Sequence, residues 1–138
     1  MGLKLKLRPD ERLIVNGCIM RNGKRRAELI IENYTDVLRG TEMLDEATAN
    51  TPVRRLCYNI QIALVSSSHR KTLIPEILAQ LDRIEEIMRR THGEVLKTVR
   101  NRIIAQDFYT AYRKLLPVIE QEKILLDIAA SRQERKSP

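Results

Sequence analysis

The chain has 138 residues, enough for one domain or for a small module fused to another, and 43% of them are hydrophobic but only 4% aromatic. We therefore expect a core built mainly from Leu, Ile, Val and Ala. A net charge of +7 permits a polyanionic partner without identifying one, and the two cysteines lie too far apart for a CxxC motif, so neither a disulfide framework nor a zinc site is predicted. No signal peptide or membrane-length apolar run is visible, which predicts a cytoplasmic protein without membrane contact.

The first segment has the alternation of a β-strand. Leu3 to Leu7 alternates leucine with lysine, which predicts a strand with three leucines on one face and two lysines on the other. A turn at residues 8–10 and a short strand at 13–15 follow. Asn16-Gly17 is the strongest short hairpin signal, because both central residues of a type I′ turn need a positive φ, and residues 18–20 provide the return strand.

A second Asn-Gly pair lies in the next part of the chain. Asn22-Gly23 predicts another tight turn, followed by a strand at residues 26–32 and a last short strand at Val37–Arg39. Residues 1–40 are therefore predicted to form a small basic antiparallel β module of about four or five short strands.

Helical patterns begin after residue 40. Residues 40–49 are acidic and could hold a short helix. Thr51-Pro52 predicts a helix start, since Thr caps well and Pro is tolerated at the first helical position, and Ser66 to Ser68 ends that helix.

Two longer helices are predicted next. An apolar stripe from Ile74 to Met88 has clear helical spacing, and Thr91 with Glu94 has the spacing of a capping box at the start of the following helix. That third helix is expected to run from about residue 95 to residue 116, until Pro117 breaks or kinks it.

A last helix is expected at residues 118–130, with a frayed polar tail from Ser131. The predicted fold class is thus α+β: the β module of residues 1–40 followed by a helical region, residues 41–138, with three to five helices. The wide apolar stripes of the helical region suggest packing against each other or against a second copy.

Two stretches of the sequence resemble a known family. Residues 8–33 contain both Asn-Gly turns and a basic-Ala strand, and residues 51–64 contain a Thr-Pro-x-Arg-Arg helix start. Together, in this order, they resemble FlbT, a family of bacterial flagellar regulators. The resemblance implies a post-transcriptional regulator that binds the 5′ untranslated region of flagellin messenger RNA and promotes its decay, although some members act positively. FlaF, another small flagellar regulator, is an implied partner.

The β module also resembles the RNA-binding regulator CsrA, an intertwined β dimer that binds RNA through its first and last strands. The likeness rests on a first basic strand, a Glu-x-Leu strand and a late Val-x-Arg followed by an acid, here Val37-Leu38-Arg39 with Glu42. It implies that the RNA face includes Lys4, Lys6, Arg8 and Arg39.

Basic side chains are concentrated in the β module, whose net charge is about +4. Arginine suits RNA because its planar guanidinium stacks on bases and holds phosphate with two bonds. The candidate RNA-binding residues are Lys4, Lys6, Arg8, Arg21, Lys24, Arg25, Arg26 and Arg39. The alternative is that these charges only solvate the outer face of a half-buried sheet. Only one aromatic residue, Tyr34, is available there for base stacking.

Arg54 and Arg55 are secondary candidates, because positive charge is unfavourable at a helix N-terminus unless an anion lies nearby. A bound anion, or an ion pair with Asp45 or Glu46, would supply it. His69 and His92 are expected to be surface or capping residues. No pattern of nucleophile, acid–base pair or metal ligands is present, so neither an enzyme nor a cofactor is predicted.

Two functions from different classes are compatible with these patterns. The first is a messenger-RNA-binding regulator whose helical region supplies dimerisation or a partner surface. The second is a protein-binding adaptor or chaperone-like factor that binds a flagellar protein through its helices and affects messenger RNA indirectly. The low aromatic content and moderate charge keep the second alternative open.

Overall fold

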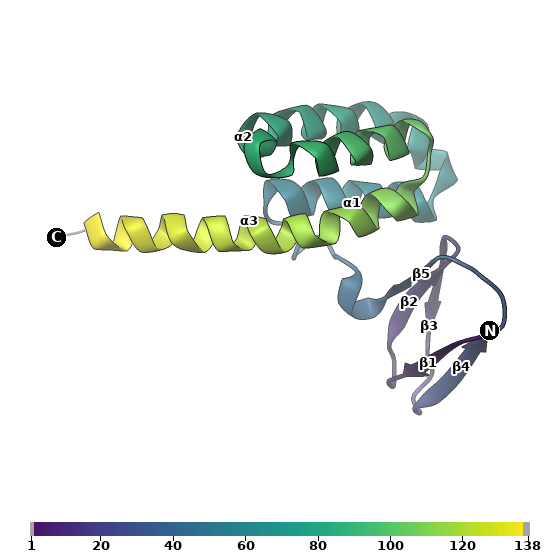
Figure 1. The fold of residues 1–138 in the computed structure, drawn as a ribbon. Coiled ribbons are helices and arrows are strands. Elements are labelled where there is room, and N and C mark those ends of the chain that lie inside the picture. Colours follow the sequence, from purple (N-terminus) through teal and green to yellow (C-terminus); the bar gives the residue numbers. More distant parts are fainter. Residues whose placement is uncertain (1, 137–138) are drawn as a thin grey trace.

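A computed structural model describes residues 2–136, and it confirms the α+β class with the strands first and the helices after them (Figure 1). The strands are β1 Leu3–Leu7, β2 Arg12–Val15, β3 Cys18–Arg21, β4 Ala27–Ile31 and β5 Val37–Arg39. The 3-10 turns are η1 Gly40–Glu42 and η2 Ser67–His69, and the long helices are α1 Pro52–Val65, α2 Arg70–Ile104 and α3 Phe108–Lys136.

The strands form two small antiparallel sheets. One contains β1 and β4, and the other has the order β3-β2-β5. The Asn16-Gly17 hairpin prediction is confirmed: β2 pairs with β3, and the two turn residues have φ values of 49° and 79°. The tip of this hairpin reaches the end of α1, since a Cβ added at Gly17 would lie 3.1 Å from the Leu64 carbonyl oxygen.

The tight turn predicted at Asn22-Gly23 is wrong, whereas the strand predicted after it is confirmed as β4. Strand β4 crosses to β1, where Leu5 is paired with Leu29 and Leu3 with Ile31. The reason is burial: all four residues of β3 are exposed, whereas Leu5 and Leu7 of β1 need an apolar partner strand. Gly23 accordingly lacks the positive φ of a type I′ turn.

The buried hydrophobic residues form two clusters, which meet at β2. Leu5, Leu7 and Leu13 form the centre of a small cluster between the two sheets. The next residue on β2, Ile14, points the other way and joins Leu38 of β5 in the main core of the helical region. Strand β2 therefore links the two clusters.

Helix α1 begins as predicted, because the Thr51 side chain accepts a hydrogen bond from the Arg54 amide and Pro52 occupies the first turn. The short helix expected in residues 40–49 is reduced to η1 and a separate turn in which Asp45 and Thr48 bond to each other. These hydrogen bonds to Thr48 hold the pKa of the Asp45 carboxyl below its usual value.

Helix α2 doubles back on itself. Its backbone leaves helical geometry at Met88 and His92, so two helical segments pack antiparallel, and Arg100 of the second forms ion pairs with Asp82 and Glu85 of the first. The break predicted near residues 91–93 is confirmed. The capping box is not: the Thr91 hydroxyl donates to the Met88 carbonyl instead.

The boundary predicted at Pro117 is wrong. The chain turns at residues 105–107, where Gln106 has a φ of 59° and the Asp107 carboxylate accepts from the Thr110 amide to start α3. Pro117 lies inside α3 on an exposed face, where the missing amide bond is tolerated. The helix also runs through the tail expected to fray from Ser131, as far as Lys136.

Polar bonds fix the strands to α3. The Tyr109 hydroxyl donates to the Val37 carbonyl at 3.1 Å, and the Tyr112 hydroxyl donates to the Glu42 carbonyl at 2.5 Å. Arg113 forms an ion pair of 2.8 Å with the Glu42 side chain. Burial raises the pKa of Tyr112, which keeps this phenol a neutral donor. The end of α3 extends beyond the other helices as an arm (Figure 1). Within residues 2–136, no helix combines the length and apolarity that crossing a bilayer requires.

Candidate nucleic-acid interface

The exposed face of the β1–β4 sheet carries both of its basic side chains, Lys4 and Lys6. The alternation predicted for β1 is confirmed for Leu5 and Leu7, which are buried, while Leu3 at the strand end is 49% exposed. Lys4 and Lys6 therefore point to the opposite, exposed side. Lys4 forms an ion pair of 2.8 Å with Glu28 of β4.

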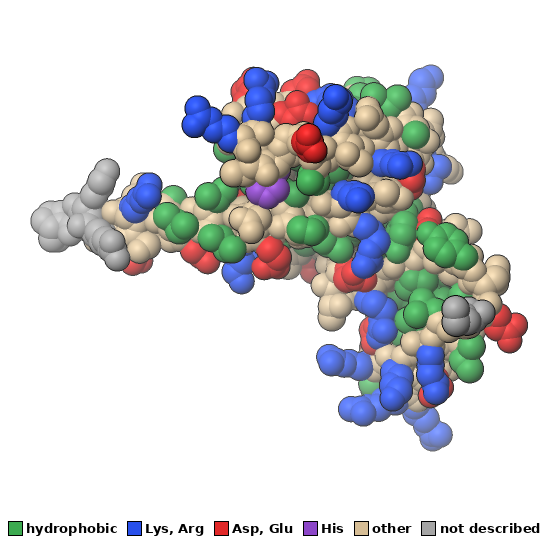
Figure 2. All heavy atoms as spheres, in the orientation of Figure 1, with side chains coloured by type: hydrophobic (Ala, Val, Ile, Leu, Met, Phe, Trp, Pro, Cys, Tyr) green, Lys and Arg blue, Asp and Glu red, His purple; other side chains and the backbone are tan. Residues whose placement is uncertain are grey.

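Four of the eight predicted residues meet around one hollow. It has a volume of about 620 Å³ and is lined by Lys6, Leu7, Arg8, Arg26, Ala27, Glu28 and Arg39. A second hollow of about 600 Å³ shares Arg8 and Arg39 with it and adds Arg12. Figure 2 shows the lysines and arginines gathered over this strand-rich part of the molecule.

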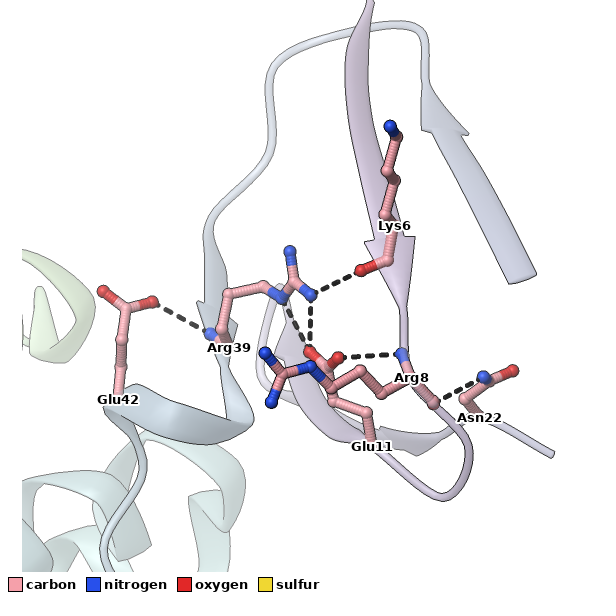
Figure 3. A network of polar contacts seen from close by, with 6 residues as sticks. All are labelled: Lys6, Arg8, Glu11, Asn22, Arg39 and Glu42. Atoms are coloured by element: carbon pink, nitrogen blue, oxygen red, sulfur yellow. Dashed lines mark hydrogen bonds and ion pairs between the residues drawn. The ribbon is translucent and has the colours of Figure 1, made fainter. Parts of the chain in front are cut away.

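Arg39 is held rigidly between the two sheets (Figure 3). Its guanidinium contacts the Glu11 carboxylate at 2.8 and 2.6 Å and donates to the Lys6 carbonyl at 2.8 Å. Glu11 also accepts from the Arg8 amide, and that bond, with Arg39 beside it, keeps the pKa of the Glu11 carboxyl below its usual value. We call these bonds among Arg39, Glu11 and the backbone of Lys6 and Arg8 the Arg39–Glu11 clamp. It holds the backbone at Lys6 and Arg8 in place, and Glu11 neutralises the charge of Arg39.

Asn22 places the basic loop next to Arg8. Its side-chain amide donates to the carbonyls of Arg8 and Arg25 at 2.7 and 2.9 Å (Figure 3 shows the first of these bonds), and the Asp10 amide donates to the Gly23 carbonyl. The second Asn-Gly pair thus joins two loops rather than two strands. Lys24, Arg25 and Arg26 follow at once, and all three are exposed.

Arg12 is a basic residue of this surface that was not among the predicted site residues. It is the direct cross-strand partner of Arg21, and both are exposed. Like charges opposite each other on neighbouring strands are destabilising, and an anion between them would relieve the repulsion. The Asn16-Gly17 hairpin signal could have revealed this pair, because it fixes the register of β2 and β3.

Most of these cations have no carboxylate partner. Among the described residues of the β module, Lys4 and Arg39 are the basic residues with a carboxylate within 4 Å. The other basic residues of the module form no such ion pair: Lys6, Arg8, Arg12, Arg21, Lys24, Arg25 and Arg26. We call these seven residues the basic face.

The secondary candidates lie elsewhere. Arg54 bonds to the Asn50 side chain, and Arg55 lines a hollow of about 210 Å³ on the helical region. The predicted ion pair with Asp45 or Glu46 is wrong. The acid at this helix start is Glu122 of α3, which is 8% exposed and accepts hydrogen bonds from the Thr51 hydroxyl and, at 2.9 Å, from the Val53 amide.

Other side chains with possible chemistry are not assembled into a site. His69 Nδ1 lies 2.6 Å from the Ser66 hydroxyl at the end of α1, and His92 Nδ1 lies 2.8 Å from the Thr91 hydroxyl. Within residues 2–136, no three His, Cys, Asp or Glu side chains cluster as metal ligands. Tyr34 is 88% exposed, and the charge of Asp36 raises its pKa.

Comparison with known proteins assigns the chain to a family. The model of a family described as "Flagellar protein FlbT" matches residues 3–126, which span both the basic face and most of α3. The chain belongs to the FlbT family. The resemblance noted from residues 8–33 and 51–64 is therefore confirmed. In the structure these stretches form the β2–β3 hairpin with the loop after it and the capped start of α1.

Curated FlbT proteins match over nearly their whole length. A protein from Rhodopseudomonas palustris and one from a Caulobacter species are both named "Probable flagellum biosynthesis repressor protein FlbT". The first is 29% identical, covering 91% of this chain and 98% of its own, and the second is 27% identical, covering 88% and 94%. The "Flagellum biosynthesis repressor protein FlbT" of Caulobacter vibrioides is 26% identical, covering 88% and 87%. No solved structure matches the chain.

Proposed function

We propose that this FlbT-family chain is a repressor of flagellum biosynthesis that acts after transcription. In this proposal it binds the 5′ untranslated region of flagellin messenger RNA through the basic face and promotes degradation of that messenger. The repressor role is supported by the names of its relatives. The role of RNA is supported by the surface chemistry.

The observation that carries the proposal is the set of seven exposed cations without carboxylate partners. On the helical surface, by contrast, Arg100 is paired with both Asp82 and Glu85. The basic face instead includes two arginines directly opposite each other, an arrangement that a phosphate backbone would stabilise.

The same residues suggest how RNA would be held. Phosphates would follow the hollow between Lys6, Arg8 and Arg26, whose backbone the Arg39–Glu11 clamp keeps fixed. A rigid site costs less ordering entropy on binding. Because Tyr34 is the single described aromatic residue before α1, stacking on bases would come mainly from arginine guanidinium groups.

Binding of pure protein to a flagellin leader RNA tests the proposal. The double variant Arg8→Glu/Arg26→Glu reverses two charges at the hollow, and Arg89→Glu/Arg90→Glu makes the same change on exposed arginines at the bend of α2. We expect the first variant to weaken leader binding at least tenfold and the second to leave it nearly unchanged, with both retaining the far-UV spectrum of the native fold.

Two results would reject the proposal. If both variants bind the leader as the unmodified protein does, the basic face is not the contact surface. If the pure protein shows no preference for the leader over an unrelated RNA of equal length but retains one flagellar protein from a cell extract, the adaptor function takes its place. Neither the RNA-binding test nor the extract test depends on whether the protein represses or promotes flagellin synthesis.

A further inference from the structure

Strand β4 has one open edge. It pairs with β1 alone, and apart from that ladder no backbone hydrogen bond in the described part of the chain involves residues 26–32. Figure 1 shows the β1–β4 sheet at the end of the β module that lies away from the helices. The strand also carries Ile30, a large aliphatic side chain that is 60% exposed. An open strand edge of this kind is a template on which another strand can pair.

The β1–β4 ladder indicates which backbone groups of β4 point to this edge. The Lys6 carbonyl of β1 is directed at the Arg39 guanidinium of β5, from which it accepts a hydrogen bond of 2.8 Å (Figure 3). In an antiparallel ladder, the backbone groups of successive residues point alternately to the two sides of the strand. Lys6 and its partner Glu28 therefore form a pair without mutual backbone bonds. It follows that Glu28 and Ile30 direct their N–H and C=O groups to the open edge.

We propose that β4 of a second copy of this chain pairs antiparallel along this edge, centred on Leu29, so that the two sheets join in the order β1-β4-β4-β1. A two-fold axis perpendicular to the sheet makes each contact occur twice. The backbone of Glu28 in each copy then bonds to that of Ile30 in the other, which uses the groups that one copy leaves free. On the inner face Leu29 lies opposite Leu29 and Ile31 opposite Ala27, so this side of the contact is apolar throughout.

The charges around β4 favour this register over its neighbours. Arg26 and Glu32 flank the strand at equal distances from Leu29, so each arginine lies opposite the glutamate of the other copy. Both side chains are exposed, and neither has an ion pair within 4 Å among residues 2–136. A shift of two residues in either direction sets Glu28 opposite Glu28 or Glu32 of the other copy, and like charges directly opposite each other are destabilising. A shift of one residue would put the apolar side chains on the wrong face.

Strand β3 is also an exposed edge strand, but it offers no such match. Its one charged residue is Arg21, and the sequence has no acid between residues 16 and 23. Pairing of β3 with itself would add further positive charge next to the Arg12–Arg21 pair. Pairing of β4 with itself instead forms an ion pair at each end of the contact. A second copy on β4 is therefore the occupant that the charges support.

The joined sheet is compatible with the basic face. Because the two-fold axis is perpendicular to the sheet, Lys4 and Lys6 of both copies lie on the same side of it. The planar guanidinium of Arg26 carries donors on more than one side, so it can hold the glutamate of the other copy and still contact the hollow. The inference concerns the protein alone and is tested without RNA, so it stands or fails independently of the proposed function.

Sedimentation velocity of the full chain over a range of concentrations tests for the dimer. Ile30→Glu sets an acid opposite Glu28 of the other copy at two places, so it should raise the dissociation constant of the dimer about tenfold. Within one copy the same position lies opposite Lys4, a good partner for a glutamate, so the variant should keep the native far-UV spectrum. The control Ile87→Glu changes an isoleucine that is 77% exposed on α2 and should leave the dimer intact.

Charge exchange and amide hydrogen exchange test the register. Arg26→Glu and Glu32→Arg should each weaken the dimer, and the double variant should recover most of the loss, because the pairs re-form with opposite polarity. The amides of Glu28 and Ile30 should exchange more slowly as the protein concentration rises, whereas the Leu29 amide, bonded to β1 in either state, should not change.

Four results would overturn the inference. One is a protein that stays monomeric up to about 100 μM, and another is a dimer that Ile30→Glu does not weaken. A double charge variant as weak as the sum of its single variants would reject the register centred on Leu29. A dimer in which the Glu28 and Ile30 amides exchange as fast as in the monomer would place the contact on another surface.

Discussion

Glu122 joins the two ends of the helical region, and replacing it should be among the most destabilising single changes to a polar residue. The carboxylate reaches the N-terminus of α1 from α3, 71 residues away from Thr51, and accepts from the Thr51 hydroxyl and the Val53 amide. That amide is one of the four donors that a helix start leaves without a partner, and Val53 is only 1% exposed.

The magnitude follows from these contacts. A hydrogen bond to a charged acceptor contributes about 1.5–3 kcal/mol, and a buried donor left without a partner costs about 1–3 kcal/mol. Glu122→Ala removes both bonds, so we expect a loss of about 3–4 kcal/mol in the free energy of unfolding. Glu122→Gln keeps an acceptor for the Val53 amide and a donor for the Thr51 oxygen but loses the charge at the helix dipole, which corresponds to about 1 kcal/mol.

Urea unfolding followed by far-UV circular dichroism measures both values, with Glu120→Gln as the matched control two residues earlier on the exposed side of α3. The control should change stability by less than about 0.5 kcal/mol. In thermal unfolding, the alanine variant should melt roughly 10–15 °C lower. If Glu122→Ala and Glu120→Gln prove equally mild, the carboxylate does not cap α1 and its interhelical role is refuted.

Three further predictions concern the strands and the cysteines. The pKa of the Glu11 carboxyl is lowered from 4.5 in the folded protein, so ionised Glu11 stabilises the fold fully above about pH 4.5 and less as the pH falls through the folded-state pKa. Glu11→Gln should therefore lose less stability on acidification than the unmodified protein does. Identical acid-unfolding curves for the two proteins would contradict this role of Glu11. Gly17→Ala should cost about 1–2 kcal/mol in urea unfolding, because the residue has a φ of 79° and the added Cβ would lie 3.1 Å from the Leu64 carbonyl oxygen; a neutral effect would argue against the type I′ geometry. Cys18 is exposed, whereas burial raises the pKa of the Cys57 thiol, so a thiol reagent should modify one cysteine of the native protein and two after unfolding; two fast reactions in the native state would contradict the packing of α1.

Local signals predicted the structure well where the chemistry is local. Leu–Lys alternation placed β1, Asn16-Gly17 gave the hairpin, and Thr51-Pro52 gave the start of α1, because in each case the deciding contacts lie within a few residues. The turn at Gln106 was missed, since a non-glycine residue with positive φ gives no sequence signal; Asp107 before Phe108 was the available clue to the helix start.

The errors come from contacts between distant segments. Pro117 was expected to break or kink a helix because its exposure could not be known, and this exposed proline lies within the continuous helix α3. The partner of β4 was not predicted, because its pairing with β1 depends on which strand offers buried leucines. The individual basic residues of the candidate site could be identified from the sequence. The clamp between Arg39 and Glu11, which are 28 residues apart, and the hydrogen bonds that Asn22 donates to the Arg8 and Arg25 carbonyls could not. The clamp neutralises Arg39, and a separate ion pair with Glu28 neutralises Lys4.

The salt dependence of leader RNA binding tests the central claim most directly. The dissociation constant is measured between roughly 50 and 200 mM salt for the unmodified protein and for Arg8→Gln/Arg26→Gln, which removes two charges from the basic face without adding negative ones. Each phosphate contact to single-stranded RNA contributes a slope of about 0.7 in a plot of log affinity against log salt, so the double variant should be less steep by about 1.4. Equal slopes for the two proteins would mean that these arginines release no counterions, and the basic face would not be where RNA lies.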